Sequence, residues 1–414
     1  MCRRRAHGTD ASRPARAGVM LRAPLGRTVS EDRSLEEFAG ADADAAGAAP
    51  VDCSFPVTVT DASGTEVTLS ETPERVVVAG PSAAQTMWAI GAQDKVVGMP
   101  NNYATAYLDG REGIPNVVNA RMQPVQEKIV NATPDLVLAP NVVQNDTVES
   151  LRNAGLTVYR FHEAITLSDV YAKTELTGRL VGEFEAAAGV SAEMEGQVSA
   201  VREAVADEEP KKVFYNLGGG WTVRPDTFIG DIISTAGGEN IAEGRLDRRY
   251  APLPSEEILV EDPDWILTTH GLELPKNTGI NESTAVEQDQ IVTVDTNFLN
   301  QPGPRNVEPL AQLASALHPE AMADVNLDDV STPEPEQCTG AMATDTPSNG
   351  TDTTDAPTPT PTATPEMNGT VGSPTFQDAN GTDTPTTGDG GPGFTVGAAL
   401  VAALVGTLLV RRRR

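Results

Sequence analysis

Few side chains in this sequence could do catalytic chemistry. The 414 residues include four histidines, whereas a metal site needs several histidine or carboxylate ligands close together. His270 with Glu273 is the one pair that fits even part of a metal site, and His162 is the other histidine near a possible cleft loop. The stretch "LGGGWTVRPD" lacks the lysine of a phosphate-binding loop, and no G-x-S-x-G nucleophile motif occurs. We therefore expect a protein that is not an enzyme and that holds no catalytic residue, metal or cofactor.

The cysteines leave two interpretations open. Cys2, Cys53 and Cys338 show no C-x-x-C spacing of a metal or redox site. Cys53 and Cys338 flank the folded region, so they could form a disulfide outside the cell. The alternative is two unrelated thiols. Cys53 follows "APVD", which lacks the apolar residues expected before a lipidated cysteine.

The charge of the chain restricts its partners. Asp and Glu number 59 against 30 Lys and Arg, which gives a net charge of −29. Such a surface repels nucleic acid and anionic lipid. A disordered acidic chain is the alternative, but 39% of the residues are hydrophobic, and strand-like and helix-like runs alternate. We interpret the composition as a folded protein adapted to high salt.

These runs predict the elements that position any site. Buried strands are expected at 74–80, 95–100 and 135–139, with a helix opened by Pro81 and Ser82 after the first of them. Strand and helix alternate again from residue 212 to 320. This alternation predicts an α/β protein with two lobes built on parallel sheets.

Between the lobes, apolar residues at helical spacing predict one long rigid helix, bent near Gly189. The predicted order is a poorly ordered or misassigned start at 1–52, a first lobe at 53–167, the helix at 168–209, a second lobe at 210–327, a disordered Thr/Pro-rich stalk at 328–391 and a C-terminal apolar helix within 392–414.

Several phrases in a fixed order resemble the class III substrate-binding proteins that serve ABC importers of vitamin B12, ferric siderophores and haem. They are "PERVVVAGPSAAQTMWAIGAQDKVVG" (73–98), "EKIVNATPDLVLAP" (127–140), "TAGGENIA" (235–242), "SEEILVEDPDWIL" (255–267) and "PGPRNVEPLAQLASALHPE" (302–320). The resemblance covers about residues 55–320. It implies a rigid connecting helix and a ligand held where strand ends of the two lobes face each other.

The resemblance also implies site residues. Vitamin B12 binders place aromatic faces around the ligand, and Trp221, Tyr250 and Phe298 match such positions, whereas Arg121 and Pro140 stand where those binders tend to be aromatic. Arg121 and Arg224 would suit an anionic siderophore. The expected ligand contacts are Pro81, Ser82, Asn101, Asn102, Tyr103, Arg121, Asn141, Asn216, Trp221, Tyr250, His270, Asn297 and Phe298.

The same family docks on its permease through one glutamate on each lobe, and Glu127 and Glu257 are the matching positions. The alternative for both is a solvated acidic face.

The function that we expect is capture of a corrinoid and its delivery to an ABC permease and its ATPase. A ferric siderophore or haem is the alternative ligand. A chelatase-like enzyme and a structural surface protein are alternatives of other classes.

The C-terminus, "GGPGFTVGAALVAALVGTLLVRRRR", resembles the PGF-type sorting signal of archaeal surface proteins at Pro392, Gly393 and Phe394. The resemblance implies processing by an archaeosortase and anchoring at the outer face of the membrane, whereas the alternative is a permanent transmembrane helix. Glycosylation sequons begin at Asn145, Asn281, Asn349, Asn368 and Asn380.

Overall fold

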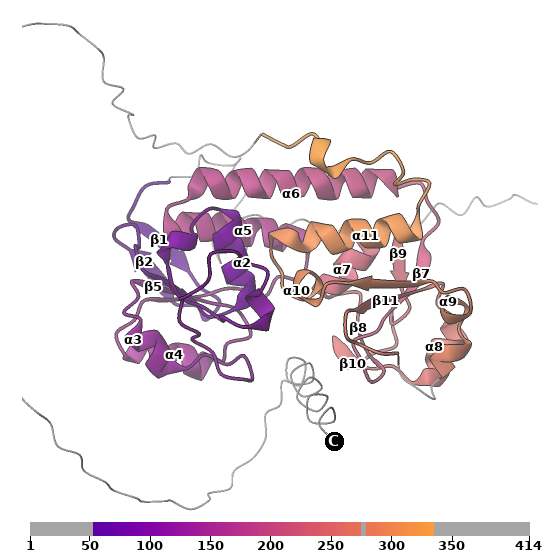
Figure 1. Cartoon of the computed structure of the whole chain (residues 1–414), viewed down its shortest axis with the longest axis horizontal. Helices are drawn as coiled ribbons and strands as arrows, with labels where there is room; N and C mark the ends of the chain where they lie inside the picture. The colour runs from indigo at the N-terminus through magenta and orange to yellow at the C-terminus, as the bar shows by residue number, and fades with distance from the viewer. Residues whose placement is uncertain (1–52, 275–278, 335–414) are drawn as a thin grey trace, which may run out of the picture. The chain divides into compact units, whose positions relative to one another are not determined.

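A computed structural model describes residues 53–274 and 279–334 of the chain. Strands and helices alternate within these residues in two groups, which we call the first lobe and the second lobe (Figure 1). Each lobe is built on a four-stranded parallel sheet. The predicted α/β fold with parallel sheets is confirmed.

The sheet of the first lobe has the strand order β4-β3-β5-β6. Val76 and Val78 of β3 face a core that includes α2, whereas Val77 faces a second core that includes α3 and α4. Alternation of this kind follows from the two-residue period of a strand, and a sheet covered on both faces needs apolar residues at every position. The elements are β3 (Val76–Val78), α2 (Pro81–Ala89), η1 (Gln93–Lys95), β4 (Val96–Gly98), η2 (Tyr103–Thr105), α3 (Gln126–Asn131), β5 (Leu136–Ala139), α4 (Asn145–Asn153) and β6 (Val158–Arg160).

The second lobe repeats this plan with the strand order β12-β11-β7-β9. Counted within each lobe, both sheets have the order second, first, third, fourth. A small antiparallel sheet of β8 and β10 is added. The elements are β7 (Lys211–Tyr215), β8 (Trp221–Val223), α7 (Phe228–Thr235), β9 (Gly238–Asn240), β10 (Tyr250–Pro252), α8 (Ser255–Glu261), β11 (Trp265–Thr269), η3 (Gly279–Glu282), α9 (Thr284–Glu287), β12 (Ile291–Val294), α10 (Thr296–Leu299), η4 (Pro304–Asn306), α11 (Val307–Leu317) and η5 (Leu327–Asp329).

The predicted single helix over residues 168–209 is wrong. Two helices occupy this region, α5 (Leu167–Val181) and α6 (Phe184–Ala204), and the break lies at Gly182 rather than near Gly189. Gly182 ends α5 in the left-handed conformation with φ 80°, which glycine adopts without steric cost. The two helices lie side by side (Figure 1), so closely that a Cβ on Gly178 would come within 2.2 Å of the Ala187 side chain.

Both helices of this hairpin join the lobes. Leu167 and Val170 at the start of α5 belong to the core of the second lobe, and Leu176 and Leu180 further along belong to that of the first. Helix α6 returns in the opposite sense, from Ala187 in the first core to residues such as Val198 in the second. Two antiparallel helices therefore connect the lobes.

Two further segments pack on the lobes outside the sequence-based expectation. A hairpin of β1 (Val57–Thr60) and β2 (Glu66–Leu69) precedes the first sheet. At the other end, Gln197 of α6 donates a hydrogen bond to the Leu327 carbonyl at 3.1 Å, and a Cβ on Gly196 would come within 2.8 Å of the Ser331 carbonyl oxygen. The first residues of the predicted stalk therefore lie against α6.

Candidate functional site

The loops that follow the central strands carry several of the predicted ligand residues. In each sheet the first and third strands are neighbours, and the chain leaves them in opposite directions, which is where open α/β sheets bind ligands. Pro81 follows β3 and Asn141 follows β5 in the first lobe, while Asn216 follows β7 and His270 follows β11 in the second. These two loop pairs form the centre of the candidate site.

Exposed large apolar side chains occur on two loops of the first lobe and in the small sheet of the second. Among residues 53–274 and 279–334, the exposed large hydrophobic residues include Tyr103, 60% exposed, Val142, 63% exposed, and Tyr250, 37% exposed. Tyr103 lies in η2 after β4, and Val142 lies beside Asn141. The prediction missed Val142, although its place after a fully buried strand could have indicated it. Large apolar groups left in water indicate a surface that a ligand or partner covers.

Trp221 and Tyr250 belong to the small sheet of the second lobe. Tyr250 pairs with Val223, and Pro252 pairs with Trp221. This register places both aromatic residues on one face of the sheet, as diagonal neighbours. Burial raises the pKa of Tyr250, and Glu163 raises it further against an opposing effect of Arg249. The phenol therefore stays neutral, and the two rings offer an uncharged aromatic surface.

Other predicted ligand residues are held inside the fold. Ser82 is buried and its Oγ accepts a hydrogen bond from Lys173 Nζ at 2.9 Å. Asn216 is buried and its Nδ2 donates to Thr268 Oγ1 at 3.2 Å. Asn101 donates to two carbonyls of its own loop, at Arg111 and Ile114. Their side chains shape the loops in this structure.

Asn102 and Arg121 lie on turns near this group. The Asn102 side chain accepts a hydrogen bond from the Ala104 amide and so begins η2. Arg121 is exposed, and its amide donates to Asn119 Oδ1 at 2.8 Å. The Arg121 guanidinium is accordingly placed on the surface.

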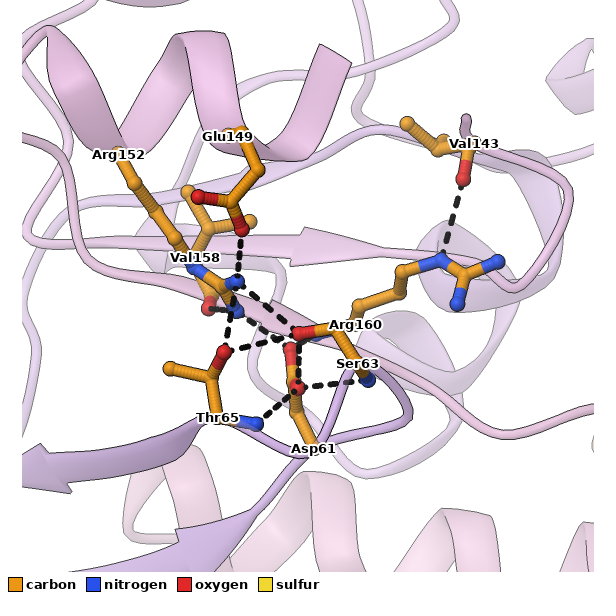
Figure 2. Close-up of polar contacts among 8 residues, drawn as sticks. All are labelled: Asp61, Ser63, Thr65, Val143, Glu149, Arg152, Val158 and Arg160. Carbon is orange, nitrogen blue, oxygen red and sulfur yellow. Dashed lines mark hydrogen bonds and ion pairs between the residues drawn. The ribbon is translucent and has the colours of Figure 1, made fainter. Parts of the chain in front are cut away.

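Arg160 at the end of β6 fixes the loop that carries Asn141 and Val142. Its Nη2 donates to the Asn141 carbonyl at 2.6 Å and its Nε donates to the Val143 carbonyl at 3.1 Å. Figure 2 shows this side chain reaching Val143 from the strand that also contacts Asp61. The Arg160 amide donates to Asp61 Oδ2 at 3.0 Å.

Asp61 lies at the centre of a buried polar cluster (Figure 2). Arg152 of α4 pairs with its carboxylate at 2.5 Å, and Ser63 and Thr65 of the β1–β2 turn donate to it. Burial alone would raise the pKa of Asp61, but the hydrogen bonds from Ser63, Arg160 and Thr65 outweigh burial and lower it. The cluster ties the hairpin to the loop of the candidate site.

Asn297 and Phe298 lie where the second lobe touches the first. The rings of Phe298 and Tyr107 meet edge to face, with centroids 5.1 Å apart, and the Arg305 guanidinium lies 4.0 Å from the Phe298 centroid. Asn297 Oδ1 accepts a hydrogen bond from Gln301. Phe298 therefore takes part in a contact between the lobes, and Asn297 binds Gln301 within the second lobe.

The two predicted docking glutamates lie in corresponding helices. Glu127 is in the first turn of α3 and Glu257 in the first turn of α8, and each helix precedes the third strand of its sheet. Glu127 borders a hollow of about 410 Å³ between α3 and the end of α4. Glu257 lies 3.9 Å from Arg245 Nη1, and the exposed Val260 is on the same helix.

The described part of the chain contains neither a metal-binding cluster nor a membrane-spanning helix. No group of three or more His, Cys, Asp or Glu side chains there could hold a metal ion. His270 is exposed at the end of β11. No helix of residues 53–274 and 279–334 is long and apolar enough to cross a membrane.

Several predicted features fall wholly or partly outside the described residues. Cys53 is disulfide-bonded, and its predicted partner Cys338 lies outside them. Asn145 at the start of α4 and Asn281 in η3 are both exposed, as glycosylation would require. The sorting-signal residues and the remaining sequons are also outside: Pro392, Gly393, Phe394, Asn349, Asn368 and Asn380.

Two parallel α/β lobes joined by a helical hairpin, with apolar and amide side chains at their strand ends, define a two-lobed solute-binding protein. Residues 76–298 match the family model described as periplasmic binding protein, and the chain belongs to this family. Its members are solute-binding proteins that act outside the cytoplasm.

Individual relatives agree with this assignment. The chain is 41% identical to the cobalamin-binding protein of Halobacterium salinarum over 319 residues, which covers 72% of this chain and 82% of the relative. The periplasmic vitamin B12 binding protein of Vibrio cholerae has a TM-score of 0.52 at 23% identity, covering 61% of this chain and 99% of that structure. The apo haem-binding protein of Roseiflexus has a TM-score of 0.55 at 23% identity, covering 60% and 99%.

Proposed function

We propose that this protein captures cobalamin outside the cell and delivers it to the permease and ATPase of an ABC importer. The observation that carries the proposal is the 41% identity to a cobalamin-binding protein over 72% of this chain. The neutral aromatic pair of Trp221 and Tyr250, with the exposed Tyr103 and Val142, supports a large, mostly uncharged organic ligand.

Titration of the purified chain with cyanocobalamin tests the proposal. The experiment is run at high salt and followed by calorimetry, with a ferric hydroxamate and haemin as parallel ligands. We expect saturable binding of one cyanocobalamin per chain and weaker or absent binding of the two iron compounds. Binding of neither corrinoid nor iron compound would contradict the proposal, and turnover of a metal–porphyrin substrate would favour the chelatase alternative.

A ferric siderophore is the second candidate ligand, and the arginines favour it. Arg121 is exposed beside the first-lobe loops, and an exposed guanidinium suits an anionic chelate. Arg224 is less available because it pairs with Asp226 at 2.7 Å. Tighter binding of the ferric hydroxamate than of cyanocobalamin in the same titration would select this candidate.

We also propose that the chain is held at the outer face of the membrane through its C-terminus. The order of Thr-rich segment, "PGF", apolar run and "RRRR" supports processing by an archaeosortase. Mass spectrometry of the mature protein should then find no peptide beyond the PGF region. An intact terminus at Arg414 would instead support a permanent transmembrane helix.

A further inference from the structure

The segment after β12 crosses from the second lobe to the first. It contains α10 and η4 and carries Asn297 and Phe298. Opposite it lie the start of α2 and the loop around η2, which carries Tyr103. Both sides therefore contain residues of the candidate ligand site.

An unbroken series of hydrogen bonds joins the two sides. In the second lobe, Gln301 Nε2 donates to Asn297 Oδ1 at 3.0 Å, and Gln301 Oε1 accepts from Tyr107 Oη of the first lobe at 3.1 Å. Tyr107 in turn accepts from Gln85 Nε2 at 2.9 Å. The Gln85 Oε1 accepts from the Arg305 amide at 2.9 Å, which returns the series to the second lobe.

Four residues of this series, Gln85, Tyr107, Gln301 and Arg305, make the contact specific, and we call them the interlobe clasp. Gln301 is 8% exposed, and its Nε2 also donates to the Ala104 carbonyl at 3.0 Å. Its amide therefore uses both donors and its acceptor, so no other side chain of similar size could replace all three bonds.

Packing around the clasp leaves little freedom. A Cβ on Gly303 would come within 2.5 Å of Gln85 Oε1, so the chain passes Gln85 at the distance that only glycine permits. The Arg305 guanidinium lies over both rings, 4.0 Å from the centroid of Phe298 and 5.5 Å from that of Tyr107. Beside it, Lys173 Nζ of α5 donates to Ser82 Oγ and to the Pro302 carbonyl.

We propose that Gln301 and Tyr107 are positioning residues, which hold the Tyr103 loop of one lobe and the Asn297–Phe298 segment of the other in one fixed arrangement before any ligand arrives. The proposal rests on the proposed function, because it assigns the clasp a role in ligand capture. A preformed site loses less conformational entropy on binding. The clasp thus supplies affinity without contacting the ligand.

Hydrogen exchange of the ligand-free protein tests the coupling itself. Gln301→Leu should speed exchange of the backbone amides at 103–108 in the first lobe as well as at 297–306 in its own lobe, by about tenfold. Exchange in β3 and β11 should not change. Gln312→Leu on α11 is the matched control, since Gln312 is exposed and donates to the Thr293 carbonyl within its own lobe; it should change neither segment.

Tyr107→Phe is the second variant. It keeps the ring that packs on Phe298 and removes only the hydroxyl between Gln85 and Gln301, so the fold should be preserved. We expect the same two segments to exchange faster. If exchange rises only at 297–306 in both variants, or at neither segment, the lobes are not coupled through the clasp and the proposal is wrong.

Binding kinetics test the consequence for capture. With cyanocobalamin, stopped-flow traces of Gln301→Leu and Tyr107→Phe should give dissociation constants at least about fivefold larger than those of the unmodified protein and of Gln312→Leu. Equal affinity in all four proteins would overturn the positioning role. If the unmodified protein binds no cobalamin, the proposed function fails, while the exchange result still decides whether the clasp couples the lobes.

Discussion

Lys173 is a lysine buried in the interior. Its side chain is 4% exposed, and its amine contacts a hydroxyl, a carbonyl oxygen and, at 5.6 Å, the ring of Phe161. Burial lowers the pKa of Lys173 to about 7. The lysine serves there through the hydrogen bonds that its amine donates to Ser82 Oγ and the Pro302 carbonyl, and not through its charge.

The first prediction concerns the pH dependence of stability at Lys173. The unfolded chain keeps this proton up to about pH 10.5 and the folded protein releases it near 7, so the unfolded state binds more protons between these values and stability must rise with pH. The rise from this group is at most about 1.4 kcal/mol per pH unit. Urea unfolding at pH 7 and pH 9 should show it in the unmodified protein and in exposed Lys128→Met, but not in Lys173→Met. An equal rise in all three would contradict the prediction.

Asp61 makes stability rise with pH as Lys173 does, but at acidic pH. Its pKa is lowered in the folded protein, so its contribution is present above the unfolded pKa near 3.8 and is lost as pH falls through the lowered folded value. Asp61→Asn should lower the free energy of unfolding by about 3 kcal/mol at pH 7, because Arg152 loses its buried partner. The difference from the unmodified protein should shrink towards pH 3. Asp94→Asn, at an exposed aspartate, should cost little at either pH.

At the scale of elements, the sequence predicts what depends on local pattern. The buried runs at 76–78 and 136–139 predict parallel strands because every position is apolar, and Pro81 predicts the start of α2. The break between α5 and α6 was missed because apolar spacing continues on both sides of Gly182. Gln85, Tyr107 and Gln301 were missed because a contact between residues about 200 positions apart leaves no local pattern.

Two glycines of the helical hairpin give a paired prediction. Gly182 has φ 80°, and a Cβ there would come within 2.8 Å of Thr72, so Gly182→Ala should destabilise the protein by about 1–2 kcal/mol. Gly189 lies inside α6 with nothing within 4 Å of an added Cβ. Gly189→Ala should therefore stabilise the protein by about 0.5–1 kcal/mol. Thermal unfolding of both variants checks the signs; destabilisation by Gly189→Ala would mean that the helix bends there.

At the scale of the whole molecule, docking on a permease would require Glu127 of α3 and Glu257 of α8 at the same time. Glu127→Arg with Glu257→Arg should abolish cobalamin uptake by cells and leave binding by the purified protein unchanged, since neither residue lies in the strand-end loops. Glu185→Arg with Glu195→Arg on α6 changes the net charge equally at exposed positions and is the control. Full uptake by the first double variant would refute docking through these glutamates.

The shared strand order of the two lobes has a consequence for that partner. Because α3 and α8 each precede the third strand of the same sheet plan, Glu127 and Glu257 lie in the first turns of corresponding helices of one structural unit that occurs twice in the chain. A permease made of two identical subunits could meet both with the same residue, one from each subunit. A single chain would then offer two corresponding contact points to a two-fold symmetric partner, without forming a dimer itself.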